Sequence, residues 1–189
     1  MKKLLLMLVL LLLTPMAWAQ GQNISGTVVN ATTGQLLPRR AVTLIQLQGN
    51  MQNVAKTTTD EQGRYRFSQS GPGPYMVEAD YNQVRYFAKV TAGQSETNVQ
   101  VYDVSSDPSL VKVDAEIMVL QPDAGQLAVV NEYRIENAAQ PPRTLNSAKG
   151  LFSFRVPPGA QVDMVRVVGP GEMPLALQAV ATAQHDVYG

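Results

Sequence analysis

The chain has 189 residues, no cysteine and a formal net charge of zero. The lack of cysteine excludes disulfides, zinc sites built on thiolates and the lipid anchor of a bacterial lipoprotein. The balanced charge argues against a nucleic-acid-binding protein, which needs a basic face.

The N-terminus is typical of a secretory signal peptide over residues 1–19. Two lysines precede an unbroken apolar run at residues 4–13, and the small residues Ala17 and Ala19 mark a cleavage point before Gln20. The alternative is an uncleaved membrane anchor, but the run is shorter than the roughly 20 residues that a bilayer requires. We therefore expect an exported protein that is periplasmic, associated with the outer membrane or extracellular. Its mature part would have 13 basic and 15 acidic residues, a net charge of −2, and no membrane span.

The mature chain alternates apolar and polar residues with a period of two, as half-buried strands do. The clearest hairpin joins residues 54–59 to residues 64–69. Between them, Asp60 can bond to its own backbone and Gly63 accepts a positive φ without steric cost. In chain order the pattern predicts seven strands in a first unit, at residues 23–30, 41–48, 54–59, 64–69, 75–82, 84–90 and 99–104. Short strands at this spacing are typical of an all-β protein with an antiparallel sandwich.

A polar stretch that contains a proline, at residues 105–109, is the best candidate for a linker. We therefore expect a first domain at residues 20–104 and a second β-rich domain at residues 110–189. The second unit has roughly five predicted strands, which include residues 111–121, 126–137, 151–156 and 161–168. Small sandwiches usually need about seven strands to cover both faces, so we expect this domain to be incomplete at its C-terminus.

Several motifs of the first unit follow one another in a recognisable order. They are ISGTVV at residues 24–29, TGQ at 33–35, AVTL at 41–44, TDEQGRYRF at 59–67 and PYMVEA at 74–79. On these motifs the region of residues 23–104 resembles the carboxypeptidase regulatory-like domain. One departure is LPRR at residues 37–40, where the family more often has a glycine after the proline.

The resemblance implies a seven-stranded, transthyretin-like (prealbumin-like) sandwich that is usually a non-catalytic accessory module. Such modules occur beside peptidases, in surface adhesins and at the front of outer-membrane receptors, and carbohydrate-binding modules are among their fold relatives.

Little in the sequence points to catalysis. The one histidine, His185, cannot supply the ligands of a zinc carboxypeptidase, nor the several histidines of the transthyretin-related hydroxyisourate hydrolases. A Ser-His-Asp arrangement with Asp186 would lack a nucleophile elbow. The acidic residues Asp60, Glu61 and Asp80 lack the spacing of a calcium loop. We therefore expect no enzyme activity and no catalytic, metal or cofactor site, with His185 exposed to solvent and Asp60 forming a turn.

A candidate binding face follows from the alternation of side chains along the strands. Charged residues fall on the outward side, and the same count turns Phe87 and Tyr102 outward, where aromatic rings can stack on sugars or anchor a protein interface. The plainer alternative is a solvated face whose cross-strand charge pairs are each worth under about 1 kcal/mol. The candidate binding residues are Phe87, Tyr102, Arg85 and Arg66, and the partner would be a glycan, a peptide or an envelope protein.

The sequence thus favours an exported, non-catalytic binding or scaffolding module. The alternative is an accessory segment at the N-terminus of a longer exported peptidase or outer-membrane receptor, whose functional part would lie beyond Gly189.

Overall fold

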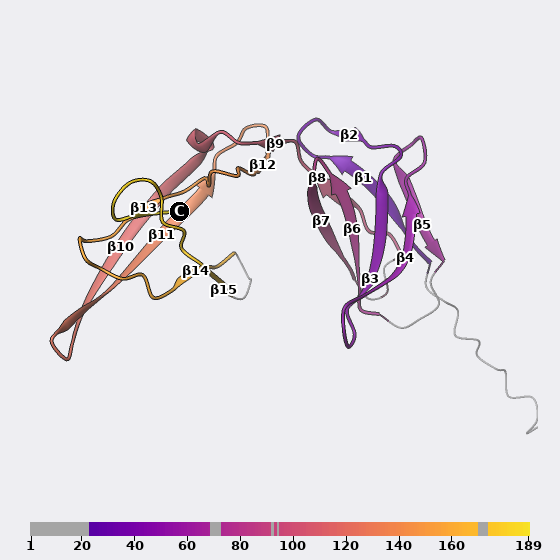
Figure 1. Cartoon of the computed structure of the whole chain (residues 1–189). Helices are drawn as coiled ribbons and strands as arrows, with labels where there is room; N and C mark the ends of the chain where they lie inside the picture. Colours follow the sequence, from indigo (N-terminus) through magenta and orange to yellow (C-terminus); the bar gives the residue numbers. More distant parts are fainter. Residues whose placement is uncertain (1–22, 69–72, 92, 94, 170–173) are drawn as a thin grey trace, which may run out of the picture. The chain divides into compact units, whose positions relative to one another are not determined.

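The computed structural model describes residues 23–68, 73–91, 93, 95–169 and 174–189 (Figure 1). These residues form strands, one short 3-10 helix and connecting turns, in two compact units. The first unit contains residues 23–30 and 34–101, and the second contains residues 31–33 and 102–189. No helix in the described ranges has the length and apolar character needed to cross a bilayer. The expected signal peptide lies outside the described residues.

The first unit consists of two four-stranded sheets. In the first sheet, β1 (Asn23–Asn30) is flanked by β2 (Gln35–Leu36), β5 (Arg64–Ser68) and β8 (Val99–Val101). The second sheet has the order β4 (Gln52–Thr58), β3 (Ala41–Gln46), β6 (Tyr75–Tyr81), β7 (Val84–Val90). The predicted all-β sandwich is therefore confirmed, with a short additional strand, β2. The pairing of β1 with β8 is parallel, unlike the others in the unit.

Alternating apolar side chains from both sheets form one buried core. The cluster comprises Ile24, Val28, Leu37, Val42, Leu44, Tyr65, Phe67, Tyr75, Val77, Ala79, Val90, Val99 and Val101. Strand β3 departs from the expected alternation, because Thr43 and Ile45 are buried as well as Val42 and Leu44. Both sides of this inner strand are therefore covered.

The predicted strand at residues 99–104 is divided between the two units. Its first part is β8, whereas Val104 belongs to β9 (Val104–Ser105), which pairs in parallel with β12 (Thr144–Leu145) of the second unit. The stretch expected as a linker also contains the start of the 3-10 helix η1 (Pro108–Leu110). Asp107 caps this helix by accepting a hydrogen bond of 2.9 Å from the amide of Ser109. Hydrogen bonds from the side chain and from the amide of Ser109 lower the pKa of the Asp107 carboxyl.

The second unit is built around one long antiparallel hairpin, β10 (Val111–Asp123) and β11 (Gln126–Asn137), which we call the ribbon. The strand predicted at residues 126–137 is confirmed. Two further pairs are short: β13 (Phe154–Arg155) with β16 (Val187–Tyr188), and β14 (Val165–Val167) with β15 (Leu175–Leu177). The longer strands expected at residues 151–156 and 161–168 are thus reduced to two and three residues.

An aromatic cluster lies against one part of the ribbon. The ring of Tyr133 is 5.1 Å from that of Phe152 and 6.4 Å from that of Phe154, which lies 6.0 Å from Tyr188. Nearer the hairpin turn, apolar side chains from both strands are 44–57% exposed, among them Ile117, Val119, Leu120, Leu127 and Val130. The second unit therefore buries far less of its described apolar surface than the first.

Candidate functional site

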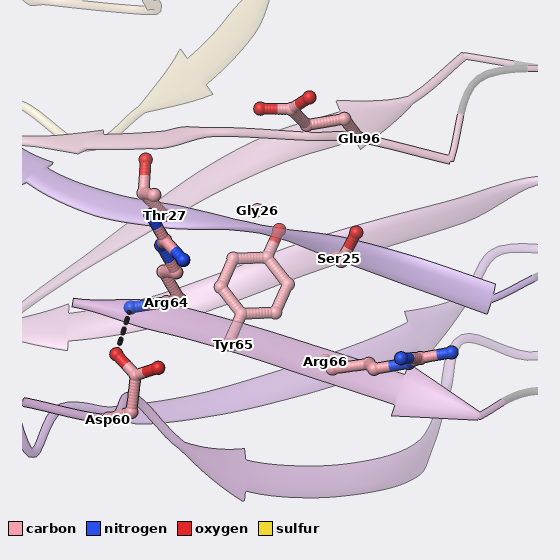
Figure 2. A pocket seen from close by; sticks show the side chains of 8 residues that line it. All are labelled: Ser25, Gly26, Thr27, Asp60, Arg64, Tyr65, Arg66 and Glu96. Atoms are coloured by element: carbon pink, nitrogen blue, oxygen red, sulfur yellow. Dashed lines mark hydrogen bonds between the residues drawn. The ribbon is translucent and has the colours of Figure 1, made fainter. Parts of the chain in front are cut away.

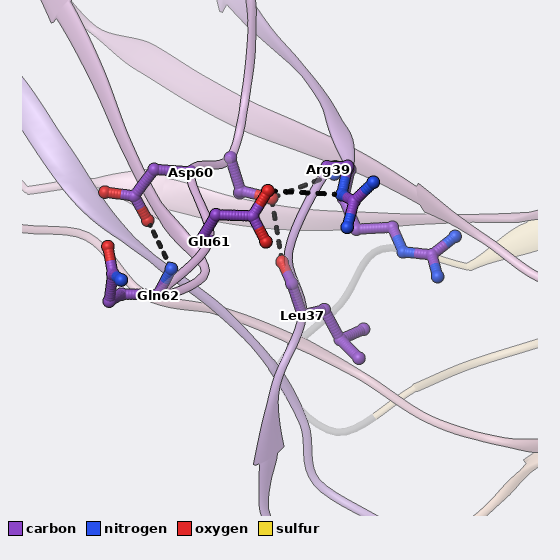
Figure 3. Close-up of polar contacts among 7 residues, drawn as sticks. Leu37, Arg39, Asp60, Glu61 and Gln62 are labelled. Carbon is purple, nitrogen blue, oxygen red and sulfur yellow. Dashed lines mark hydrogen bonds and ion pairs between the residues drawn. The ribbon is translucent and has the colours of Figure 1, made fainter.

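The start of β5 is fixed by a turn centred on Asp60. Its Oδ1 atom accepts hydrogen bonds from the amides of Gln62 (2.9 Å) and Arg64 (2.8 Å). The Asp60 amide donates to the Arg64 carbonyl at 2.9 Å, and Gly63 has the positive φ of +71° that the turn requires. The predicted role of Asp60 as a turn former is confirmed, and Figure 3 shows its bond to Gln62. The turn sets the position from which Arg64 and the rest of β5 project.

A second turn supports the first from the side (Figure 3). The buried hydroxyl of Thr59 donates to the Leu37 carbonyl at 2.7 Å and accepts from the amide of Arg40 at 2.8 Å. Arg39 has φ = +56°, in the left-handed region that favours glycine, and its Nε lies 3.4 Å from an oxygen of Glu61. The departure from the family pattern at residues 37–40 thus coincides with an arginine in a conformation that suits glycine.

The segment after β7 is held against β1 by backbone bonds. The Ser25 amide donates to the Ser95 carbonyl and the Thr97 amide donates to the Ser25 carbonyl, both at 2.8 Å. Because Ser25 pairs with Glu96 in a parallel bridge, Glu96 has a fixed place beside β1. On the buried side, the Tyr65 hydroxyl donates a hydrogen bond to the Thr97 carbonyl. Burial raises the pKa of Tyr65 well above its ordinary value.

Together these elements form an open groove of about 490 Å³ (Figure 2). Its lining residues are Ser25, Gly26, Thr27, Asp60, Arg64, Tyr65, Arg66 and Glu96. Ser25 lies opposite Arg66 in the β1–β5 ladder and opposite Glu96 on its other side. Figure 2 accordingly shows Glu96 and Arg66 on either side of the strand that carries Ser25. We call this feature the β1 groove.

The flanks of the β1 groove carry charges of opposite sign. Neighbouring strands lie about 4.8 Å apart, so the backbones of Glu96 and Arg66 are separated by two such steps, about 10 Å. Their side chains form no ion pair with each other. Neither Arg64 nor Arg66 makes an ion pair with another residue of the described ranges, and both are exposed. Asp60 also lines the groove, and the amides bonded to its Oδ1 hold its carboxylate in the turn without removing its charge. The groove therefore offers two guanidinium groups on the β5 flank, with the carboxylate of Asp60 at the start of that strand and the carboxylate of Glu96 on the opposite flank.

The four candidate binding residues do not lie on one face. Arg66 is on β5 in the first sheet, whereas Arg85 and Phe87 are on β7 in the second. Phe87 is 49% exposed, and Arg85 lies 3.9 Å from a carboxylate oxygen of Glu78. Tyr102 is half-buried and belongs to the second unit. Alternation along a strand indicates whether a side chain points inward or outward. It does not indicate which sheet the strand joins, and for this reason it could not show that Arg66 lies on a different sheet from Arg85 and Phe87.

Sequence reasoning assigned no role to Ser25 and Glu96, which the groove contains. No local signal could have brought them together, because their bridge joins residues 71 positions apart. His185 is exposed as predicted, and its Nδ1 is 2.5 Å from Oδ2 of the adjacent Asp186. Within the described part of the chain, no three histidine, aspartate or glutamate side chains are grouped to hold a metal ion.

Comparison with known proteins finds a family model that matches the N-terminal part of the described chain. Residues 23–105 match the family model of the carboxypeptidase regulatory-like domain. A curated relative is the TonB-dependent transporter Oar of Myxococcus xanthus, which is 34% identical over 73 residues. This match covers 39% of the present chain but 7% of the transporter, so the chain spans only a small part of that relative's length.

Two solved structures are also similar, at low TM-scores. The 5-hydroxyisourate hydrolase of Klebsiella pneumoniae has a TM-score of 0.33 and 17% identity, over 43% of this chain and 88% of that one. A candidate carbohydrate-binding protein of Bacteroides uniformis has a TM-score of 0.27 and 15% identity, over 62% of this chain and 54% of that one. Scores this low carry no inference about function. Residues 23–105 therefore match the carboxypeptidase regulatory-like domain, in agreement with the sequence motifs.

Proposed function

We propose that the chain is an exported, non-catalytic recognition module whose ligand binds in the β1 groove. The observation that carries this proposal is the pair of arginines, Arg64 and Arg66, which project beside the groove without an ion-pair partner among the described residues. Export is supported by the signal-peptide pattern of residues 1–19. A non-catalytic role is supported by the regulatory type of the matched domain.

The groove suits a polar ligand that carries an acidic group. Guanidinium groups bind carboxylates and phosphates through paired, charge-assisted hydrogen bonds. Glu96, on the opposite flank, can accept hydrogen bonds from hydroxyl or ammonium groups of the same ligand. Because the bonds at Ser25, Asp60 and Thr97 fix the backbone around the groove, little conformational entropy is lost on binding. An acidic glycan or a peptide with carboxylates fits this description.

The test is a binding screen of the full chain against acidic and neutral glycans and peptides. Arg64→Ala and Arg66→Ala should each weaken binding of the acidic ligands by several-fold, since exposed charge pairs are worth up to about 1 kcal/mol. Phe87→Ala is the matched control, because Phe87 is on the other sheet. The proposal fails if the wild-type chain binds none of these ligands. It also fails if Phe87→Ala abolishes binding while both arginine variants bind normally.

A second candidate is an accessory segment within a longer envelope protein. The observation that favours it is the match to a segment of the TonB-dependent transporter, a much longer protein. The test is the coding sequence downstream of the codon for Gly189. A membrane-embedded or catalytic domain in the same reading frame would support this role, and a stop codon at that point would rule it out.

A further inference from the structure

Strand β5 pairs with a neighbouring strand, β1, on one side only. The hydrogen bonds that β1 makes on its other side show in which direction the amides and carbonyls of β5 point. In the antiparallel ladder, Ser25 and Thr27 turn their amides away from β5, towards Ser95 and Asn98. Hydrogen-bonded and non-hydrogen-bonded pairs alternate along such a ladder. The partners of Ser25 and Thr27, which are Arg66 and Arg64, therefore turn their own amides and carbonyls away from β1, towards the outer edge of the sheet.

At Arg64 this outer edge is closed. The Arg64 amide donates to the Asp60 carboxylate at 2.8 Å, and its carbonyl accepts from the Asp60 amide at 2.9 Å. Arg66 and Ser68 have no such partner within the described ranges, and both are exposed. The edge of β5 therefore offers two amides and two carbonyls in the phase of a β-ladder.

The positive charge beside this edge indicates which kind of polypeptide can pair with β5 as an added strand. A strand added to β5 would place its side chains directly opposite Arg66 and diagonal to Arg64, within reach of both. A second copy of β5 would bring arginine against arginine, and like charges directly opposite one another are destabilising. An added strand with carboxylates at alternate positions would instead meet both guanidinium groups on the outer face. Its other side chains would turn towards buried Phe67 and should be small and apolar.

We propose that β5 binds an extended, acidic segment of a partner protein as an additional strand, through the edge formed by Arg66 and Ser68. This inference rests on the proposed function, because the same two arginines recognise the acidic ligand, but it specifies that ligand as a polypeptide with alternating carboxylates whose backbone lies along the outer edge of β5 rather than between β5 and Glu96. Backbone bonds at Arg66 and Ser68 hold the segment, and Arg64 and Arg66 select for acidic side chains. The free edge is short, which limits the ladder to these two residues.

The experiment measures binding of synthetic hexapeptides to the full chain by calorimetry or fluorescence anisotropy. One peptide alternates glutamate and valine, and a second alternates lysine and valine. A third design is the glutamate peptide with N-methyl groups on every other amide. It is made in two versions, one methylated at the odd-numbered amides and one at the even-numbered amides. We expect the glutamate peptide to bind and the lysine peptide not to bind. One of the two N-methylated versions should bind at least about tenfold more weakly than the glutamate peptide, because the amides that donate to β5 are blocked in it.

Two variants of the chain complete the test. Ser68→Pro removes an outward amide at a position where an edge strand tolerates proline. This variant should lower the affinity for the glutamate peptide at least about tenfold. Arg66→Gln leaves the backbone amides and carbonyls of the edge unchanged. It should lower the affinity for the glutamate peptide about two- to fivefold. Thermal melting checks that both variants are folded, and the N-methylated peptides test the edge on the wild-type chain if Ser68→Pro is not.

The outcomes separate this inference from the proposed function. If the glutamate peptide binds through Arg66 but is insensitive to N-methylation in either phase, strand addition is wrong and ligand recognition by the groove stands. If no peptide binds while an acidic glycan does, strand addition is again wrong. If neither class of ligand binds, both proposals fall.

Discussion

At the scale of single residues, Tyr65 links the core of the first unit to its surface groove. Its ring packs 5.6 Å from that of Phe67, and its hydroxyl donates to the Thr97 carbonyl. Removing the hydroxyl leaves a buried carbonyl without its donor, which costs about 1–2 kcal/mol. We expect Tyr65→Phe to lower the free energy of unfolding by that amount in urea denaturation at neutral pH.

The same residue gives the stability of the first unit a dependence on alkaline pH. Burial raises the pKa of folded Tyr65, whereas the unfolded side chain titrates near its ordinary pKa of about 10. Below that value both states keep the proton, and above it the unfolded state loses the proton first. The free energy of unfolding should therefore fall as the pH rises above about 10.

Urea denaturation at about pH 8 and at about pH 11 measures this fall. In Tyr65→Phe the fall should be smaller, because this variant lacks the buried phenol whose pKa is raised. Equal falls in the wild-type chain and in Tyr65→Phe would show that Tyr65 is not the group responsible.

Gly26 is required by a close approach rather than by an unusual backbone angle. A Cβ atom at this position would lie 1.8 Å from the Thr97 carbonyl oxygen, which is backbone and cannot rotate away. Gly26→Ala should therefore displace the segment around Thr97 and cost about 3 kcal/mol, the upper part of the range for overpacking. Thermal or urea denaturation measures the cost.

A useful comparison is Gly34→Ala. Gly34 has φ = +75° and open space around it, so this substitution introduces strain without a clash and should cost about 1 kcal/mol. If Gly26→Ala proves no more harmful than Gly34→Ala, the contact with Thr97 does not constrain β1.

At the scale of elements, the turn before β3 places Arg39 where glycine would be less strained. A left-handed conformation costs a non-glycine residue about 1–2 kcal/mol, which exceeds the worth of the exposed pair with Glu61. Replacing Arg39 by glycine would relieve this strain, but part of the stabilisation is offset because glycine has more conformational entropy in the unfolded chain. We expect Arg39→Gly to stabilise the first unit by about 0.5 kcal/mol, measured by thermal denaturation.

Arg40→Gly is the control for this turn. Arg40 has no positive φ, and its guanidinium lies 5.4 Å from the centre of the Tyr81 ring, a contact that glycine would lose. This variant should be less stable than the wild type. A loss of stability in Arg39→Gly as large as that in Arg40→Gly would contradict the strain interpretation.

The strands of the first unit could be predicted well because their signals are local. The two strands on either side of Asp60 needed only the threonine-rich run, Asp60 and Gly63 to be recognised. The prediction that these strands pair as a hairpin is wrong, because β4 pairs with β3 in the second sheet whereas β5 pairs with β1 in the first. Strand β2 could not be found, since Gln35 and Leu36 are two exposed residues paired with β1. The β1 groove could not be found either, because it depends on a bridge between Ser25 and the distant Glu96.

The candidate binding face illustrates the limit of period-two patterns. Arg66 and Phe87 were both correctly placed on the outside of their strands. Their strands, β5 and β7, belong to different sheets, which only long-range pairing decides. The binding roles of these residues remain predictions that the arginine and Phe87 variants test.

At the scale of the whole molecule, the two units differ in how they are stabilised. In the first unit, side chains from both sheets form one continuous core. In the described part of the second unit, the buried apolar side chains are Ala139 and Val187. Local opening is easiest where few apolar contacts are buried. The sequence indicated this difference only through the small number of strands predicted for the second unit, because the alternation of residues does not show whether another layer covers a strand.

Hydrogen exchange measured by mass spectrometry should reveal the difference directly. Amides of β1, β3 and β6 should exchange only with global unfolding of the first unit, whereas amides of the ribbon near its hairpin turn should exchange at least about tenfold faster. The amides of β8 serve as an internal reference, since both Val99 and Val101 are fully buried. Equal protection of the ribbon and the first unit would show that the exposed apolar side chains are covered in solution.

The hydrogen bonds between Asp60 and both main-chain groups of Arg64 have a further consequence for the chain at high concentration. An uninterrupted row of unsatisfied amides is a template for fibrous stacking between identical molecules. One carboxylate at the head of β5 interrupts that row, and the two neighbouring guanidinium groups repel a like strand. The residue that shapes the turn between β4 and β5 thus hinders stacking of identical strands, while the remaining free edge of β5 can still accept a short added strand.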